Sequence, residues 1–133
     1  MLVIDAGVLA VALVDDGPDG GAVRARLRGE ELAAPALIDL EVASVWRGLV
    51  RGGHLDARRA ALALTDLADL PIQRVAHTPL LVRCWELREN LTIYDAAYVA
   101  LAEALGAALV TGDRRLAKAP GPRCAIEVLK VHS

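Results

Sequence analysis

The segment TIYDAAYVALAEALGAALVTGD, residues 92–113, is the part of the chain that says most about its fold. Thr92 is a typical helix-capping residue, and the Ala- and Leu-rich run after it predicts a helix that stops at Gly106. Residues 108–111, ALVT, form a short apolar run of the kind found in buried strands, and Gly112-Asp113 follows directly. A helix followed at once by such a strand is typical of an α/β fold.

The same alternation of apolar runs and helical segments extends along the chain. Strands are expected at residues 2–4, 31–34, 72–75, 108–111 and 125–129. Helices are expected at residues 8–14, 22–27, 37–51, 57–69 and 92–105, from Thr78 onward, and as a short turn after Asp113. This predicts an α/β fold in one domain over residues 1–133, with a mostly parallel sheet between two layers of helices. Arg24, Arg26 and Arg28 are expected to face water.

Composition argues against several kinds of nucleic-acid binding. The chain is 55% hydrophobic and 24% charged, which indicates a globular protein. Only 3% of the residues are aromatic and Phe is absent, so rows of stacking aromatic side chains are not expected. The 15 basic and 17 acidic residues give a formal net charge of −2, which argues against binding by bulk positive charge. Any nucleic acid is therefore expected to be held by a local patch or through a metal.

The cysteines and the first residues predict the compartment. Cys84 and Cys124 fit no zinc spacing and are predicted to be small buried hydrophobes in a reducing compartment. The opening residues, Met1 to Ile4, carry no basic segment and run straight into Asp5. The longest apolar runs are too short to cross a bilayer. We therefore expect a cytoplasmic protein without membrane contact.

The residue types available for catalysis point to carboxylates. The sequence has no glycine-rich phosphate loop, no zincin helix and no G-x-S-x-G motif. Ser44 is the only serine before the last residue, and His54, His77 and His132 are scattered through expected loops and the tail. A Ser–His or Cys–His nucleophilic pair has little to be built from, so Asp and Glu side chains remain.

Two aspartates follow strands that a parallel sheet can bring together. Asp5 ends the strand at residues 2–4, and Asp113 follows the strand at residues 108–111 after one glycine. Because ligands bind at the carboxyl ends of parallel strands, both carboxylates are expected at one edge of the sheet. The alternative for each is an ordinary helix cap, which is a common role of Asp after a strand.

Asp95 and Glu41 lie on expected helices. Asp95 shares a helical row with Tyr98 and apolar side chains, which suggests that it faces the protein. Its alternative is a capping box, in which the Asp95 carboxylate bonds back to the Thr92 amide. Glu41 lies at the margin of an apolar helix face, and its alternative is a solvated acid on the helix surface.

Four acids in one pocket would repel one another unless cations were bound. Oxygen-only sites of this kind suit Mg²⁺, with Mn²⁺ as a substitute. Two such ions about 4 Å apart can activate a water and stabilise the leaving oxygen when a phosphodiester is cleaved. That chemistry needs neither serine nor histidine, so it fits the residues that this chain offers.

The acids and their sequence context resemble the PIN-domain ribonucleases, and within them the VapC toxins of toxin–antitoxin modules. The resemblance rests on Asp5 after the first strand, PALIDLEV at 35–42, RENLTIYDAAYVALA at 88–102 and TGD at 111–113. The segment YDAAY, residues 94–98, is its most specific part. The resemblance implies a PIN-like α/β/α sandwich, a homodimer and a metal-dependent endoribonuclease, a hydrolase that acts on RNA phosphodiester bonds and leaves a 5′-phosphate.

Matched position by position, the resemblance implies a catalytic site made of Asp5, Glu41, Asp95 and Asp113. Asp5, Asp95 and Asp113 are the implied metal ligands, with Asp5 and Asp95 the most direct. Glu41 and Asp113 would complete the metal's shell or orient the attacking water. Thr111 matches the polar residue that supports the last acid.

The resemblance also implies partners. A cognate VapB-like antitoxin would neutralise the chain by wrapping it with its C-terminal segment and covering the acidic cleft. Operator DNA would be contacted only through that antitoxin. Phosphates of the RNA substrate could be held by Arg47, Arg114 and Arg115, whose alternatives are surface solubilisation or ion pairing.

One departure from the family pattern keeps a second hypothesis open. Such families commonly place Ser, Thr or Asn two residues after the first Asp, where this chain has Gly7. Losing a supporting side chain of this kind can cost about 10–100-fold in metal affinity or activity. The chain would then be a catalytically weak or inactive PIN-like partner that acts by antitoxin binding and operator autoregulation. An aspartyl phosphohydrolase is set aside, because residues 5–7 lack the second acid of D-x-D.

Overall fold

The computed structural model describes residues 1–131, and a sheet of five strands lies at its centre. The strands are β1 (Leu2–Ile4), β2 (Leu32–Pro35), β3 (Gln73–Val75), β4 (Ala108–Thr111) and β5 (Ile126–Val128). They lie in the order β3-β2-β1-β4-β5, and every neighbouring pair is parallel. Each strand expected from the sequence is present, and the predicted parallel sheet is confirmed. His132 lies outside the described residues.

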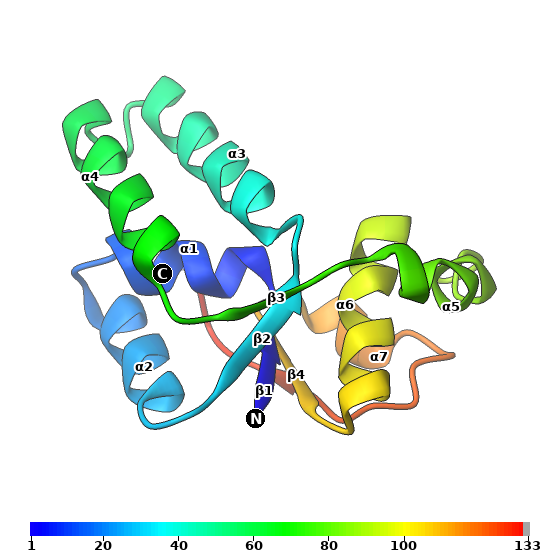
Figure 1. Ribbon diagram of the computed structural model, residues 1–133. Helices are drawn as coiled ribbons and strands as arrows, with labels where there is room; N and C mark the ends of the chain where they lie inside the picture. The colour runs from blue at the N-terminus through cyan, green and yellow to red at the C-terminus, as the bar shows by residue number, and fades with distance from the viewer. Residues whose placement is uncertain (132–133) are drawn as a thin grey trace.

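Helices cover both faces of the sheet. They are α1 (Ala6–Val14), α2 (Pro18–Leu27), α3 (Ile38–Arg51), α4 (Ala57–Asp69), the short 3₁₀ turn η1 (Thr78–Leu80), α5 (Leu81–Glu86), α6 (Ile93–Leu105) and α7 (Arg114–Lys118). Helices α1 to α4 lie on one side of the sheet and α5 to α7 on the other (Figure 1). The predicted α/β/α sandwich is therefore confirmed. Within residues 1–131, no helix is both long and apolar enough to span a bilayer.

Two helices begin earlier than predicted, one because a side chain caps it and the other because proline suits its first position. α1 begins at Ala6 rather than at residue 8, because the Asp5 side chain accepts a hydrogen bond from the Val8 amide and caps the helix. α2 begins at Pro18 rather than at residue 22. Proline breaks a helix interior but is favoured at the first helical position, where its missing N–H is not needed.

The expectation that Arg24, Arg26 and Arg28 face water is wrong for Arg26 and incomplete for Arg24. Arg26 is half-buried and pairs with Glu127 of β5 at 2.6 Å. Arg24 is exposed, but its Nη1 donates to two carbonyls at the C-terminal end of α1, at 3.1 and 2.7 Å. Arg28 is exposed as expected. Arg24 thus binds carbonyls at the end of α1, which lack partners within the helix, and Arg26 ties α2 to β5.

The core is built from small and branched aliphatic side chains, as the absence of Phe requires. β1 and β4 are central strands and are almost fully buried. α6 packs on β1, β2 and β4 with a buried face that includes Ala96 and Ala100. Trp46 of α3 is a large buried side chain, and its Nε1 donates to the Ala10 carbonyl at 3.3 Å. This packing holds the strand ends, and the acids that follow them, in fixed places.

The two cysteines are free thiols inside or against this core. Cys84 is buried as predicted, whereas Cys124 is only half-buried. Burial raises the pKa of both thiols. Because the thiolate is the reactive form, neither residue is set up as a nucleophile.

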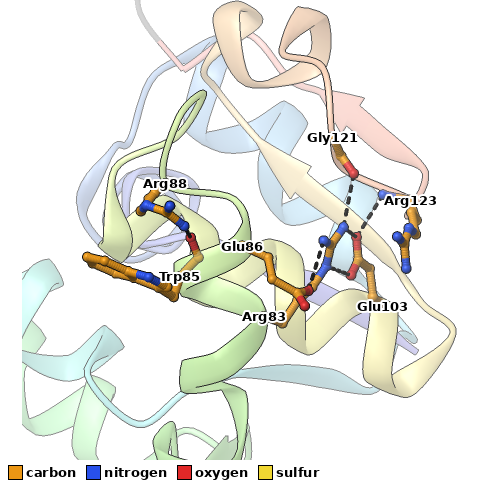
Figure 2. A network of polar contacts seen from close by, with 7 residues as sticks. All are labelled: Arg83, Trp85, Glu86, Arg88, Glu103, Gly121 and Arg123. Carbon is orange, nitrogen blue, oxygen red and sulfur yellow. Dashed lines mark hydrogen bonds and ion pairs between the residues drawn. The ribbon is translucent and has the colours of Figure 1, made fainter.

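An ion-pair network fastens α5 to α6 and to the loop before β5 (Figure 2). Arg83 donates to both carboxylate oxygens of Glu103, at 2.7 and 3.1 Å, and to the Gly121 carbonyl at 3.0 Å. Glu103 also accepts the backbone N–H of Arg123 at 2.7 Å. The Arg83 guanidinium therefore holds the pKa of Glu103 below its usual value.

Candidate active site

The order of the strands reverses between β1 and β4, and acidic side chains gather at this point. From β1 the sheet continues to β2 and β3 on one side and to β4 and β5 on the other. Ile4 pairs with Val110, and the Asp5 amide donates to the Val110 carbonyl at 3.1 Å, so Asp5 and Thr111 are neighbours. The carboxyl ends of strands at such a reversal are where open α/β sheets bind ligands. The shared edge predicted for Asp5 and Asp113 is therefore present.

Asp5 is both a helix cap and a partner of β4. Its Oδ1 accepts the Val8 amide at 2.9 Å, and its Oδ2 accepts a hydrogen bond from the Thr111 hydroxyl. Burial raises the pKa of the Asp5 carboxyl, and the charges of Asp95 and Asp113 act in the same direction, whereas the two hydrogen bonds lower it. The helix-cap alternative is thus correct without excluding a site, because a carboxylate has several lone pairs.

Asp113 is linked to Asp5 through one buried side chain. The Thr111 hydroxyl donates to Asp5 and also accepts the Asp113 amide at 3.0 Å, and Thr111 is fully buried. The Asp113 Oδ1 accepts the Arg115 amide at 2.9 Å, which caps α7. Thr111 therefore contacts both acids, whereas the resemblance assigned it only to the last acid, Asp113.

Asp95 lies in the first turn of α6, and only half of its predicted capping box is present. The Thr92 hydroxyl accepts the Asp95 amide at 3.1 Å. The reciprocal bond, from the Thr92 amide to the Asp95 carboxylate, is absent from the hydrogen bonds of residues 1–131. The helix N-terminus is thus capped by Thr92, and the Asp95 carboxylate lines the cleft instead.

Glu41 has a partner that sequence reasoning missed. The Tyr98 hydroxyl donates to Glu41 Oε1 at 2.6 Å, and the Tyr98 side chain is only 3% exposed. Burial, followed by this contact with Glu41, raises the pKa of Tyr98. A signal was present in the sequence, since Tyr98 follows Asp95 by three positions on the same helix face and brings a hydroxyl into an apolar row.

The four acids line three adjoining hollows rather than one. Asp5, Glu41 and Asp95 line a hollow of about 330 Å³. Asp5 and Asp113 line a second of about 350 Å³, and Asp95 and Asp113 line a third of about 230 Å³. Asp5, Asp95 and Asp113 each line two of these hollows, whereas Glu41 and Asp113 share none, so the single pocket expected for the four acids is instead a row of adjoining hollows. Within residues 1–131, no three His, Cys, Asp or Glu side chains are already grouped as a metal site.

The chemistry of these side chains fits a hard divalent cation. The donors that line the hollows are oxygens, namely the four carboxylates, the hydroxyls of Ser44, Thr92 and Tyr98 and the amide of Asn90, with no His or Cys among them. Mg²⁺ and Mn²⁺ prefer oxygen ligands, whereas zinc sites are usually built from nitrogen and sulfur. The charges of Asp95 and Asp113 disfavour the ionised form of Asp5. A cation bound between these acids would favour that form instead.

Two of the three arginines predicted to hold RNA lie at this cleft. Arg114 and Arg115 both line the hollow that Asp5 and Asp113 share. Arg47 is exposed on α3 and lines none of the hollows described for residues 1–131. Asp39, a nearby acid on α3, is held outside the cleft by Arg74, at 2.7 and 3.0 Å.

Gly7 leaves open space beside Asp5. It lines two of the acidic hollows, and a Cβ built there would lie 3.7 Å from Asp5 Oδ1, an ordinary contact distance. Asp5 nevertheless has two hydrogen-bond partners without any help from position 7. The support that a side chain at this position would supply comes instead from Thr111 and the α1 amide of Val8.

An apolar groove adjoins the acids on the side of α1 and α3. It has a volume of about 750 Å³ and shares Gly7 with two acidic hollows. Its apolar lining includes Val11, Val14, Val45, Leu49 and Val131. The groove and the acidic hollows are therefore neighbours on the surface.

Comparisons with known proteins agree with this architecture. The sequence matches the model of the PIN domain family over residues 2–122. Over 129 residues it is 41% identical to the VapC ribonuclease Mb0985 of Mycobacterium bovis, which covers 97% of this chain and 98% of that protein.

Solved structures share the fold. The crystal structure of PAE2754 from Pyrobaculum aerophilum matches with a TM-score of 0.70 and 27% identity, covering 96% of this chain and 83% of that one. The crystal structure of VapBC2 from Rickettsia felis, bound to a DNA fragment from its promoter, matches in fold with a TM-score of 0.67 and 13% identity. The match covers 96% of this chain and 98% of that one. On its family match and its identity to the M. bovis protein, the chain belongs to the PIN-domain family, among the VapC-type members.

Proposed function

We propose that this chain is a Mg²⁺-dependent endoribonuclease, the toxin of a VapBC-like toxin–antitoxin pair, which hydrolyses RNA phosphodiester bonds in the cytoplasm. The observation that carries the proposal is that Asp5, Glu41 and Asp95 line one hollow where the strand order reverses. Asp113 adjoins them through the Thr111 hydroxyl. The identity of 41% to a protein named a VapC ribonuclease supports the same activity.

In this proposal Asp5, Asp95 and Asp113 hold the cation, and Glu41 completes its shell or orients the attacking water. Mg²⁺, or Mn²⁺ in its place, supplies a Lewis acid that makes water a better nucleophile and offsets charge on the phosphate. Preorganised carboxylates serve this chemistry because they need little rearrangement when charge develops.

The side chains around the acids position them and the substrate. The Thr111 hydroxyl and the Val8 amide both donate to Asp5, which favours its ionised, metal-binding form. Arg114 and Arg115 on the rim would hold phosphates on either side of the scissile bond. Because their guanidinium groups are exposed at the cleft edge, we expect them to affect RNA affinity more than the chemical step.

Cleavage of total RNA with Mg²⁺ or Mn²⁺ tests the proposal. The native chain should cleave, whereas Asp5→Ala and Asp95→Asn should lose activity by at least about 100-fold. Asp66→Asn, an exposed acid on α4, is the matched control and should cleave like the native chain. Equal activity of all four proteins, or no loss when the metal is chelated, would refute the proposal.

The weak-enzyme alternative rests on Gly7, and the structure offers a specific argument against it. The side chain missing at position 7 would have supported Asp5, but Asp5 already accepts two hydrogen bonds. Calorimetry separates the two hypotheses: an inert partner takes up no Mn²⁺ at millimolar concentration, whereas the enzyme binds it.

We propose a VapB-like antitoxin as the partner, with its C-terminal segment seated in the apolar groove. The groove shares Gly7 with two acidic hollows, so apolar side chains would fill it and a neighbouring basic side chain would reach the carboxylates. Operator DNA would be contacted through the antitoxin. Val14→Asp should abolish co-purification with the antitoxin while RNA cleavage persists; unchanged co-purification would contradict this placement.

We also propose that the chain forms a homodimer, as VapC-type members of the family are expected to do. Light scattering on the purified chain should then give twice the monomer mass of 14.1 kDa. A mass of one chain at micromolar concentration would contradict it.

A further inference from the structure

We propose that Tyr98 is a positioning residue of the site, which holds the Glu41 carboxylate over the acidic hollow from the opposite helix layer. The inference rests on the proposed function, because it assigns Tyr98 a part in metal binding. Tyr98 lines the same hollow as Asp5, Glu41 and Asp95. Its hydroxyl reaches Glu41 Oε1 at 2.6 Å.

The contact joins parts of the fold that otherwise have no polar link. Glu41 lies on α3, which packs against α1 and α4, and Tyr98 lies on α6, which packs against the sheet and α5. These helices belong to opposite sides of the sandwich (Figure 1). Among the hydrogen bonds and ion pairs of residues 1–131, that between Tyr98 and Glu41 is the one that joins α3 to α6. It spans the carboxyl edge of the sheet, where the cleft opens.

Glu41 needs such a restraint more than Asp5 and Asp113 do. Asp5 and Asp113 are short side chains fixed by backbone amides of their own helices. Glu41 has a longer, half-buried side chain, and ordering a free Glu side chain costs conformational entropy. A contact that fixes the side chain beforehand removes most of that cost from metal binding.

The chemistry of a tyrosine hydroxyl suits this task. It is neutral at pH 7 and donates one hydrogen bond, so it orients the carboxylate without cancelling its charge. A lysine or arginine at the same place would neutralise Glu41 and compete with the cation. Oε1 accepts the Tyr98 hydroxyl, and no hydrogen bond or ion pair among residues 1–131 occupies Oε2.

A purely structural role for Tyr98 is the competing explanation, since its ring is buried in the core. Tyr98→Phe separates the two roles because it keeps the ring and removes only the hydroxyl. A structural role predicts a loss of stability that does not depend on Glu41. A positioning role predicts an effect that vanishes when Glu41 is absent.

The experiment is a double-mutant cycle read by Mn²⁺ calorimetry and by RNA cleavage. Tyr98→Phe should weaken Mn²⁺ binding and cleavage by about 10–100-fold, the usual effect of removing a group that orients a metal ligand. In the Glu41→Ala background the same change should have no further effect on either quantity. Tyr94→Phe, at an exposed position on the same helix, is the matched control and should bind Mn²⁺ like the native chain.

Three outcomes would overturn the inference. Two of them concern Tyr98→Phe: native-like Mn²⁺ affinity, or an equal loss with and without Glu41. Glu41→Asp, which shortens the side chain without touching the core, breaks the contact from the other side. It should weaken Mn²⁺ binding by a similar factor, and an unchanged affinity would also overturn the inference. If the native chain itself neither binds Mn²⁺ nor cleaves RNA, the proposed function fails, which is a different result.

Discussion

The buried hydroxyl of Thr111 donates a hydrogen bond to the Asp5 carboxylate and so ties the end of β4 to the end of β1. The same hydroxyl accepts the Asp113 amide at 3.0 Å. One side chain therefore sets the spacing of two acids that lie 108 positions apart in the sequence. The Asp5 amide also donates to the Val110 carbonyl of β4 at 3.1 Å, but among the described residues the Thr111 hydroxyl is the one side-chain link between the two strand ends.

Thr111→Val tests the importance of that link. Valine has the same shape but removes the donor to Asp5 and the acceptor of the Asp113 amide. We expect a stability loss of about 1–3 kcal/mol from the unpaired groups and a fall of about 10–100-fold in RNA cleavage. Urea unfolding and cleavage assays measure the two effects. Thr65→Val, at an exposed position on α4, should change neither, and native-like cleavage by Thr111→Val would contradict the assigned role.

Gly7→Ser should improve the site. A Cβ at position 7 lies at an ordinary contact distance of 3.7 Å from Asp5 Oδ1, so the side chain fits and its hydroxyl can donate to that oxygen. We expect Mn²⁺ affinity to rise by about 10-fold, at the lower end of the range for such support. Gly7→Ala is the control. It should stabilise α1 by about 1 kcal/mol through the higher helix propensity of alanine, but it adds no hydroxyl beside Asp5. Equal Mn²⁺ affinities of the serine and alanine variants would show that no such support is gained.

Asp5→Asn should stabilise the metal-free protein while it abolishes cleavage. Folding raises the pKa of Asp5, chiefly by burial. The stability that Asp5 contributes is therefore full below the ordinary pKa of Asp and is lost as the pH rises through the raised value. At pH 7 in EDTA we expect the variant to melt several degrees higher, since 1 kcal/mol shifts the melting temperature by about 4 °C.

The advantage of Asp5→Asn should depend on pH and on metal. It should disappear at a pH low enough to protonate Asp5 in both states, and it should shrink when Mg²⁺ stabilises the native chain. A lower melting temperature of the variant at pH 7 in EDTA would mean that the ionised carboxylate stabilises the fold.

Glu103 should make stability depend on pH in the opposite sense. Folding lowers its pKa, mainly through the hydrogen bonds from Arg83. The stability it contributes is therefore present above the ordinary pKa of Glu and is lost as the pH falls through the lowered value. We expect Glu103→Gln to lose about 1–3 kcal/mol at pH 7 and to show a weaker pH dependence in urea unfolding between pH 5 and 3. Cleavage should be unchanged, because Glu103 lies about 12 Å along α6 from Asp95. Parallel pH profiles of the native chain and the variant would contradict this.

The fold was predictable because its signals are local. The apolar runs at residues 2–4 and 108–111 are strands, and the ends of parallel strands must meet at one edge. Asp5 and Asp113 could be placed together on that basis. The start of α2 was missed because Pro18 breaks a helix in one context and begins it in another.

The pairing of Glu41 with Tyr98 was not predictable in the same way. It depends on where α3 and α6 lie relative to each other across the sheet, and no local pattern carries that information. The half-formed capping box at Asp95 is a similar case. The spacing allowed the Asp95 carboxylate either to bond to the Thr92 amide or to face the cleft. The ion pair between Arg26 and Glu127 likewise depends on where β5 lies in the sheet.

A crystal of the native chain soaked in millimolar Mn²⁺ would show whether the acids bind a cation, because the anomalous signal of manganese locates the ion itself. We expect a peak in the cleft, within about 2.0–2.3 Å of carboxylate oxygens of Asp5 and Asp95 and adjoining Asp113. The absence of any peak between these residues, or manganese bound only elsewhere on the surface, would contradict it.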